Sequence, residues 1–202
     1  MKYKITGLII FIVSIHTFSQ DLLTGITYSI AVPTGETKNF ISKTSFAGLT
    51  LDLRKFVSYD VSVDFLLGWN AFEEESKELI SIPNADITGT QQRLMNSFPI
   101  MIATHYYFGE GTEFRPFIGA GVGTYYIYQQ FELGLAVLES SKWHFGFEID
   151  AGMVYLLETI YALVNVRYHN AFKAENEITG KSTAYAYWAF NIGLALTPLT
   201  YF

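Results

Sequence analysis

Residues Trp143–Val154, WHFGFEIDAGMV, decide the fold of this chain. Taken alternately, they separate into one set of mainly large apolar side chains and one of carboxylates, an imidazole and glycines. The first set is Trp143, Phe145, Phe147, Ile149 and Ala151, and the second is His144, Gly146, Glu148, Asp150 and Gly152. Because successive side chains of a β-strand point to opposite faces, this pattern predicts an amphipathic strand. The period leaves two arrangements open, a soluble sandwich with the aromatic residues in its core or a transmembrane barrel with the carboxylates inside.

The composition of the 202-residue chain excludes several classes of protein. It is 17% aromatic and 16% charged, whereas an average globular chain has about 25% charged residues. Without cysteine it forms neither disulfides nor thiolate metal sites. Its net charge of -6 offers no basic surface for phosphates, which argues against nucleic-acid binding. No calcium-loop or metal-ligand spacing is present, so we expect no cofactor.

The N-terminus predicts export. Residues 1–19 begin with two lysines, continue through the apolar run Leu8–Ile15 and end in small residues, the pattern of a cleaved secretory signal peptide. The apolar run is shorter than the ~20 residues that a membrane-spanning helix requires. Residues 20–202 are then expected to form a single domain.

The β period recurs along the rest of the chain. We expect eight strands, at Thr24–Pro33, Ser45–Val57, Val61–Asn70, Leu94–Phe108, Arg115–Gln129, Trp143–Val154, Ile160–His169 and Thr183–Leu196. Tight turns are predicted near Ser58, Gly111 and Glu158. Longer polar loops are predicted at Thr34–Lys43, Phe72–Arg93, Gln130–Ser141 and Ala171–Ser182, with a hairpin extension at Phe131–Leu138 as an alternative.

Two features of these strands require an explanation. Pro99 cannot donate to a ladder, so we expect it at a bulge or an unpaired position. Gly119, Gly121 and Gly123 fall on one face of a strand, where they would normally weaken it. They predict a narrow interior in which long side chains from neighbouring strands need space.

Strand length and connection length favour the membrane arrangement. Soluble strands usually have ~5 to 6 residues, whereas a tilted strand needs ~9 to 11 to cross hydrocarbon. Short turns alternate with longer loops, and the strand number is even, as in bacterial outer-membrane barrels. Aromatic residues near strand ends suit interfacial girdles. They are Tyr106, Tyr107, Phe108, Tyr125, Tyr126, Tyr128, Trp143, Tyr185 and Trp188. The predicted fold is all-β, an eight-stranded antiparallel up-and-down transmembrane β-barrel.

Three segments carry a resemblance to a known group. RPFIGAGVGTYY at Arg115–Tyr126, FPIMIATHYYF at Phe98–Phe108 and WAFNIGLAL at Trp188–Leu196 resemble the small outer-membrane β-barrel proteins of Gram-negative bacteria. These are the OmpA-like, OmpX-like and OmpW-like barrels, in the form common among Bacteroidetes. The resemblance covers essentially the whole mature chain and implies an integral outer-membrane protein, in contact with lipid and lipopolysaccharide.

The polar faces predict what lies inside such a barrel. The inward set is Asp52, Arg54, Asp64, His105, His144, Glu148, Asp150, Asn165, Arg167, His169 and Asn191. All but His144 and Asn191 are predicted to form a structural lumen network, because buried charges need partners. Pairing across the hairpin turn near Glu158 would place Asp150 beside Arg167 and Glu148 beside His169. A similar argument places Arg54 near Asp64.

Eight strands leave an interior that side chains can fill, so no open pore is expected. The main prediction is a structural or adhesive protein with a plugged lumen. A gated path for protons or small solutes is the first alternative. A lipid A-modifying enzyme is the second, because RYHNAF at Arg167–Phe172 faintly resembles the motif of lipid A deacylases. Since Asn170 and Ala171 stand where a serine nucleophile is needed, we do not predict an enzyme.

The loops are the expected contact surface for any protein partner. Loops carry function on a rigid scaffold, and residues 72–93 and 171–182 contain charged side chains at the outer end of the barrel. An extracellular or envelope protein is the partner class predicted for them. Loops that only shield the top of the barrel are the alternative.

Overall fold

The computed structural model describes residues 22–82, 85–109, 112–134, 136–158, 160–176, 178 and 180–196, without the side chains of residues 77–89 and 176. The predicted signal peptide, residues 1–19, lies outside the described residues, as does Gly111 of the second predicted turn. Within these ranges no helix is long and apolar enough to cross a membrane.

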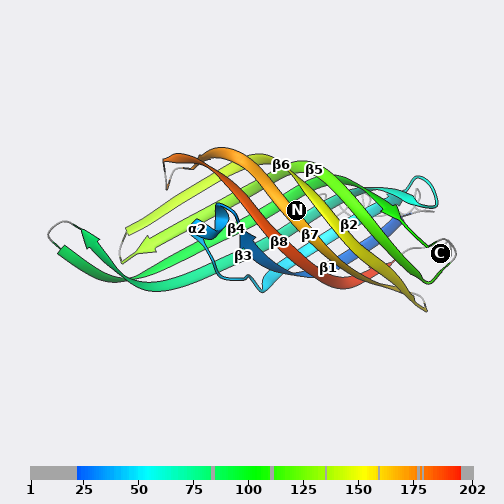
Figure 1. The fold of residues 1–202 in the computed structure, drawn as a ribbon, viewed down its shortest axis with the longest axis horizontal. Helices are drawn as coiled ribbons and strands as arrows, with labels where there is room; N and C mark the ends of the chain where they lie inside the picture. The colour runs from blue at the N-terminus through cyan, green and yellow to red at the C-terminus, as the bar shows by residue number, and fades with distance from the viewer. Residues whose placement is uncertain are drawn as a thin grey trace, which may run out of the picture.

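Eight antiparallel strands close into one barrel, which confirms the predicted fold class (Figure 1). They are β1 (Leu22–Thr34), β2 (Ala47–Phe56), β3 (Val61–Ile82), β4 (Ala85–Tyr107), β5 (Phe114–Leu133), β6 (Ala136–Leu157), β7 (Ile160–Asn176) and β8 (Lys181–Leu196). Each strand pairs with its neighbours in the chain, and β1 pairs with β8 from Thr24↔Leu196 to Thr34↔Ala186. The single described helix, α2 (Thr37–Phe40), follows β1.

The two ends of the barrel differ. At the hairpin end, β1–β2, β3–β4, β5–β6 and β7–β8 are connected; at the turn end, the connections are β2–β3, β4–β5 and β6–β7. Figure 1 shows the β3–β4 hairpin reaching well beyond the rest of the hairpin end.

The predicted loops at Phe72–Arg93 and Ala171–Ser182 are wrong, because the strands continue through them. Of the two possibilities given for Gln130–Ser141, the hairpin extension at Phe131–Leu138 is confirmed. The β3–β4 ladder runs on to Ile82↔Ala85, the β5–β6 ladder to Leu133↔Ala136 and the β7–β8 ladder to Asn176↔Lys181. Outside a membrane both faces of a hairpin can meet water, so its strands need no apolar–polar alternation and give no amphipathic signal. The fourth predicted loop contains the one-turn helix α2.

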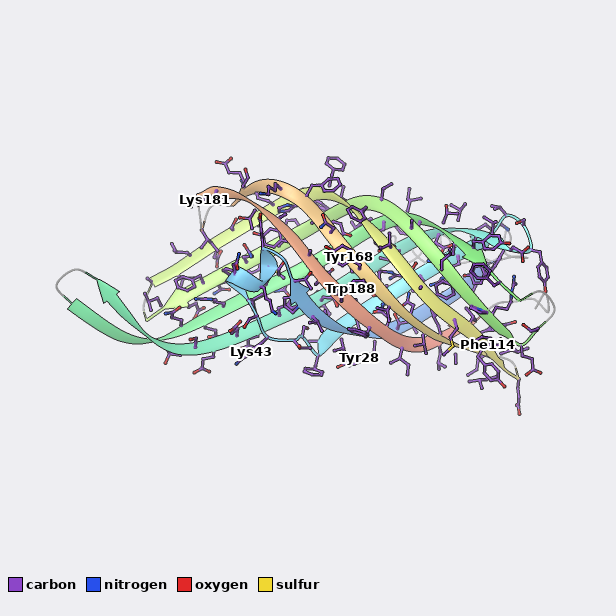
Figure 2. All side chains as sticks on the ribbon, in the orientation of Figure 1. Tyr28, Lys43, Phe114, Tyr168, Lys181 and Trp188 are labelled. Carbon is purple, nitrogen blue, oxygen red and sulfur yellow. The ribbon has the colours of Figure 1, made fainter. Side chains whose placement is uncertain are left out.

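The apolar faces of the strands point outward. Val122 is 68% exposed and Phe145 75%, whereas Glu148 and Arg167 are buried inside the barrel. Figure 2 shows side chains projecting all around the ribbon, with Tyr168 and Trp188 on the outer wall in mid-barrel. Their rings lie 4.9 Å apart on neighbouring strands. The barrel is therefore turned inside out relative to a soluble sandwich, as predicted.

Part of the predicted aromatic girdle is wrong. Tyr107, Tyr125 and Tyr185 are buried in the lumen, at most 2% exposed. Each occupies an inward position of its strand, so Tyr106 faces out and its neighbour Tyr107 faces in. The girdle was predicted from closeness to a strand end. That criterion also includes tyrosines whose side chains, by the alternation of the strand, point into the barrel.

The positions of Pro99 and the glycines are explained by close packing. The β3–β4 ladder is interrupted opposite Pro99, between Leu67↔Ile100 and Asn70↔Ser97. A Cβ atom on Gly68 would lie 2.7 Å from the Pro99 Cγ atom. On β5, a Cβ atom on Gly119 would overlap both the His105 ring and the Asp150 carboxylate. Gly119 thus leaves the space in which those two groups meet.

Substitution of Gly119 by alanine should destabilise the barrel. The added methyl group must displace His105 or Asp150, and overpacking of this kind costs about 1–3 kcal/mol. Urea unfolding of the refolded protein in detergent measures the free energy of unfolding. Ala120→Val, at the adjacent outward position, is the matched control and should leave that free energy nearly unchanged. Equal stabilities for Gly119→Ala and the wild type would contradict this account.

Candidate functional site

The nine residues of the predicted lumen network all lie inside the barrel, each at most 8% exposed. They come from β2, β3, β4, β6 and β7, so the fold brings together side chains that are far apart in the sequence. We call this group the ion layer: Asp52, Arg54, Asp64, His105, Glu148, Asp150, Asn165, Arg167 and His169.

The strand register places the predicted partners opposite one another. Asp150 pairs with Arg167 and Glu148 with His169 in the β6–β7 ladder, and Arg54 pairs with Asp64 in the β2–β3 ladder. The Arg167 Nη2 atom lies 3.2 Å from Asp150 Oδ2, and the Arg54 Nε atom lies 3.5 Å from Asp64 Oδ2. Glu148 is held by longer contacts, 3.6 Å to the Nε of Arg167 and 3.5 Å to the Nδ1 of His169.

Two residues join these pairs across the lumen. His105 on β4 contacts Asp64 through Nδ1 and Asp150 through Nε2, the latter at 2.8 Å. Arg167 on β7 also reaches Asp52 on β2, at 3.5 Å between Nη2 and Oδ1. The ion layer is therefore one connected network that links β2, β3 and β4 with β6 and β7.

The ion layer contains four carboxylates, two guanidinium groups and two imidazoles. A neutral imidazole has a single N–H, so His105 can donate to both Asp64 and Asp150 only when it is protonated. Asn165 Nδ2 donates to Asp150 at 2.8 Å, and Arg54 Nη1 donates to the Tyr107 hydroxyl at 2.9 Å. Because each charged group has an oppositely charged neighbour, the network can remain ionised away from water.

Buried apolar side chains lie toward the turn end, below the ion layer. This lower apolar layer consists of Leu23, Tyr107, Phe117, Val154, Tyr161, Leu163 and Ala195, with Phe56 and Leu156 packed against it. Phe117 also lies under the Arg54 guanidinium, whose carbon is 4.5 Å from the ring centroid. The guanidinium is thus covered on one side by an aromatic face.

A second apolar layer lies above the ion layer, toward the hairpin end. It consists of Ala31, Ile41, Leu66, Phe72, Met95, Met101, Tyr125, Ile127, Ala171, Tyr185, Tyr187 and Ala189, with Phe40 packed against it. Its tyrosines are tied to polar neighbours, since the Tyr187 hydroxyl lies 3.1 Å from the Ser97 hydroxyl and that of Tyr125 lies 3.2 Å from the His169 Nδ1. The ion layer is enclosed between two apolar layers.

The β1–β2 connection folds over this upper layer. We call residues 36–43 the latch. Ile41 is fully buried in the upper apolar layer, and the Thr37 hydroxyl accepts a hydrogen bond from the Ala186 N–H at 2.7 Å. Arg93 donates to the Phe40 carbonyl at 3.1 Å. The latch is therefore bound to β4 and β8 and covers the lumen at the hairpin end.

Glu74 holds the far side of the latch. Its carboxylate accepts hydrogen bonds from the Ser42 N–H, the Ser42 hydroxyl and the Lys43 N–H. Glu74 lies in the part of β3 that extends beyond the barrel. Partial burial disfavours its ionised form, but these hydrogen bonds and the charge of Arg93 outweigh that effect and lower the pKa of Glu74 below its ordinary value of 4.5.

The sequence did not predict the contacts that Tyr107, Tyr125 and Arg115 make inside the barrel. Tyr107 and Tyr125, assigned to the girdle, contact the ion layer instead. Arg115 is 2% exposed and donates from Nη2 to the Tyr59 carbonyl at 2.8 Å, which fixes the β2–β3 turn to β5. Strand alternation could have identified both tyrosines. The contact of Arg115 joins residues distant in sequence and left no local signal.

The two remaining inward residues, His144 and Asn191, face the lumen outside the ion layer. His144 Nδ1 lies 2.8 Å from the Phe172 carbonyl, and Asn191 accepts a hydrogen bond from Ser29. Among the described residues, no group of three or more His, Asp or Glu side chains is arranged to hold a metal ion.

Comparison with known structures shows which folds this barrel is similar to. No protein-family model and no curated protein matches the chain by sequence. The structure of outer membrane protein W of Escherichia coli matches 89% of this chain and 98% of its own, with a TM-score of 0.51 and 16% identity. OprG from Pseudomonas aeruginosa matches 88% and 95%, with a TM-score of 0.53 and 14% identity.

The chain has the fold of the small outer-membrane β-barrels. This confirms the predicted resemblance at the level of the fold. The outer membrane protease OmpT from Escherichia coli also matches, over 88% of this chain and 96% of its own, with a TM-score of 0.53 and 6% identity. Because one barrel in this set is named as a protease and the other two only as outer-membrane proteins, the likeness does not assign an activity.

Within an outer-membrane β-barrel fold, loss of Arg167 should be strongly destabilising. Arg167→Ala leaves Asp52, Glu148 and Asp150 without a shared cation, and breaking a buried ion pair costs about 3–5 kcal/mol. The free energy of unfolding in detergent should fall by this amount. Lys43→Ala, an exposed charge at the hairpin end, is the control. If the added change Asp150→Asn recovers none of the lost stability, the assigned pair is incorrect.

The latch should open when Glu74 loses its charge. Glu74→Gln weakens the hydrogen bonds to Ser42 and Lys43, so amide hydrogen exchange in residues 36–43 should accelerate, whereas Glu75→Gln on the neighbouring exposed position should not change it. The lowered pKa of Glu74 means that the stabilisation is complete above pH 4.5 and is lost as the pH falls through the folded-state pKa. Protection of the latch that is lost already between pH 8 and pH 5 would contradict this role.

Proposed function

We propose that this protein is an exported integral outer-membrane barrel whose lumen is closed along its length, and that it serves a structural or adhesive role through its outer surfaces. The observation that carries the proposal is the filling of the lumen. An ion layer lies between two apolar layers, and the latch covers the upper one. An eight-stranded barrel is just wide enough for its side chains to fill, so this filling supports a plug.

Lipid is the proposed surrounding of the barrel wall. Large apolar side chains are exposed on all faces of the wall, and Val122, Phe145 and Ile192 are each at least 60% exposed. Exposure on this scale is rare on soluble monomers but expected where acyl chains cover the surface. We therefore assign outer-membrane lipid and lipopolysaccharide as the partners of this surface.

The hairpins are the proposed contact surface for another protein. The β3–β4 and β7–β8 hairpins, within residues 72–93 and 171–182, extend the sheet beyond the barrel instead of forming loose loops. Preformed strands lose less conformational entropy on binding than loops do. This supports an extracellular or envelope protein as the partner, with the barrel as its rigid support.

We do not propose an enzymatic activity. The imidazole of His169 points into the lumen, where its neighbours are the Tyr125 hydroxyl and the Glu148 carboxylate. A base for acyl transfer would need a nucleophile within hydrogen-bond reach and access to the substrate. His169 is 2% exposed and the Tyr125 ring is fully buried, so a substrate has no access to them.

The latch is the observation that favours a gated path as the second candidate. Unlike the strands, residues 36–43 lie outside the barrel ladder and are held by side-chain contacts and by the burial of Ile41, so they can move away without breaking the ladder. Such a gate would still have to open the ion layer beneath it. We therefore propose that the latch is part of the plug.

Planar-bilayer recordings test the closed lumen. The refolded wild-type protein should show no stepwise conductance, because charged side chains and apolar layers leave no continuous water path. A variant with residues 36–41 replaced by glycine and serine should also remain silent, since the lower apolar layer, the ion layer and the rest of the upper apolar layer persist. Stepwise conductance of the wild type would overturn the proposal. Conductance of the latch variant alone would favour the gated path.

A further inference from the structure

Glu148 differs from the other carboxyl groups of the ion layer in the length of its contacts. The Arg167 Nε atom lies 3.6 Å and the His169 Nδ1 atom 3.5 Å from its Oε2 atom. Neither of its side-chain oxygen atoms has a hydrogen-bond partner among the described residues, and the residue is 1% exposed. Asp150, by contrast, accepts hydrogen bonds from Asn165 and Arg167. An ionised carboxylate that is buried without a hydrogen bond is strongly disfavoured.

The hydrogen bond of His169 is directed away from Glu148. The Tyr125 hydroxyl donates its single hydrogen atom to the Phe147 carbonyl at 2.9 Å. In the 3.2 Å contact between this hydroxyl and the His169 Nδ1 atom, the imidazole is therefore the donor. A neutral imidazole has only one N–H, so His169 in this state has none left for Glu148.

The row of side chains that contains Glu148 is closely packed and mainly apolar. In the strand register Glu148 lies between Gly121 on β5 and His169 on β7. The row continues to Ala103 on β4 and Tyr187 on β8. A Cβ atom on Gly121 would lie 2.8 Å from the Ala103 Cβ atom and 3.1 Å from the Glu148 Cγ atom. Glu148 therefore lies at the upper margin of the ion layer, against the upper apolar layer that contains Tyr187.

The charges of the ion layer do not balance when Glu148 is ionised. Its other three carboxylates are matched in number by three cations that contact them. The carboxylates are Asp52, Asp64 and Asp150, and the cations are Arg54, Arg167 and His105, protonated where it donates to two aspartates. Local pairing allows each group a charge, but an ionised Glu148 would give the layer one net negative charge away from water.

Charged and titratable groups face Glu148 from six strands. They are Asp52 on β2, His105 on β4, Tyr125 on β5, Asp150 on β6, Arg167 and His169 on β7, and Tyr187 on β8. The Arg167 guanidinium is shared, since it also contacts Asp52 and Asp150. It therefore does not supply a full compensating charge to Glu148.

We propose that the lumen contains a binding site for one exchangeable proton, held at neutral pH by the Glu148 carboxyl group. In this state the ion layer has three positive and three negative charges. When the O–H bond breaks, the proton passes to solvent and an uncompensated negative charge remains beside the upper apolar layer, which weakens the plug there. The inference deepens the proposed function, because it rests on the closed lumen and makes that closure dependent on pH.

Infrared spectroscopy of the full refolded chain tests the proton site. The detergent is a polyoxyethylene ether, which has no carbonyl group. At pH 7 the wild type should show the carbonyl stretch of a protonated carboxyl group, and this band should shift when the protein is refolded in D2O. Glu148→Gln should abolish the band, whereas Glu139→Gln, at an exposed position of the same strand, should keep it. Absence of the band from the wild type, or its persistence in Glu148→Gln, would overturn the proposal.

The pH dependence of unfolding detects the same proton. Glutamate in an unfolded chain is ionised at neutral pH, so the folding wild type takes up a proton that Glu148→Gln does not need. Between about pH 5 and pH 7, the wild-type folding equilibrium constant should therefore fall about 10-fold per pH unit relative to that variant. Equal pH dependence of the two proteins would contradict the proposal.

A third variant tests the charge balance. Asp52→Asn removes a negative charge near Glu148, so its infrared band should disappear at a lower pH than in the wild type. An unchanged pH of disappearance would overturn the charge-balance argument. Bilayer recordings of the wild type test the closed lumen and the infrared band tests the proton, so the failure of one is distinguishable from the failure of the other.

Discussion

The burial of charged side chains inside the barrel is the constraint on which this structure depends. Carboxylates and guanidinium groups occupy the middle of the barrel, and each requires an oppositely charged neighbour at close range. Gly119 is necessary because His105 and Asp150 meet where its side chain would be. The strand register is equally constrained, because a slip of one residue would turn Asp150 and Arg167 toward lipid. The interior network thus selects one register among the many that an extended strand could adopt.

The fold was readable from the sequence because the membrane imposes one rule on every spanning strand. Alternation in Trp143–Val154 gave the orientation of β6, and pairing about the turn near Glu158 placed Asp150 opposite Arg167. The alternation of apolar and polar side chains is required only where the strands contact lipid. Beyond Phe72 both faces of the β3–β4 hairpin can be polar, so its strands resembled a loop.

Contacts between distant segments were the part of the interior that sequence could not supply. His105 on β4 reaches Asp150 on β6 across β5, and Arg167 on β7 reaches Asp52 on β2 across β8 and β1. Such contacts depend on the curvature of the closed barrel and on side-chain length. The girdle prediction is wrong for the lumen-facing tyrosines for a simpler reason: closeness to a strand end does not decide which face of the strand a side chain is on, whereas alternation does. The latch was missed because its hold on β3, β4 and β8 is made by single side chains and one buried isoleucine.

The protruding hairpin has a mechanical consequence. From Phe72 to Ile82 the strand spans roughly 34 Å at 3.4 Å per residue, about the hydrocarbon thickness of a bilayer. Glu74 and Arg93 face each other at the base of this projection, and the same two side chains grip the latch. The hairpin and the latch therefore share Glu74 and Arg93, so a change in the position of the hairpin base would strain the contacts of the latch.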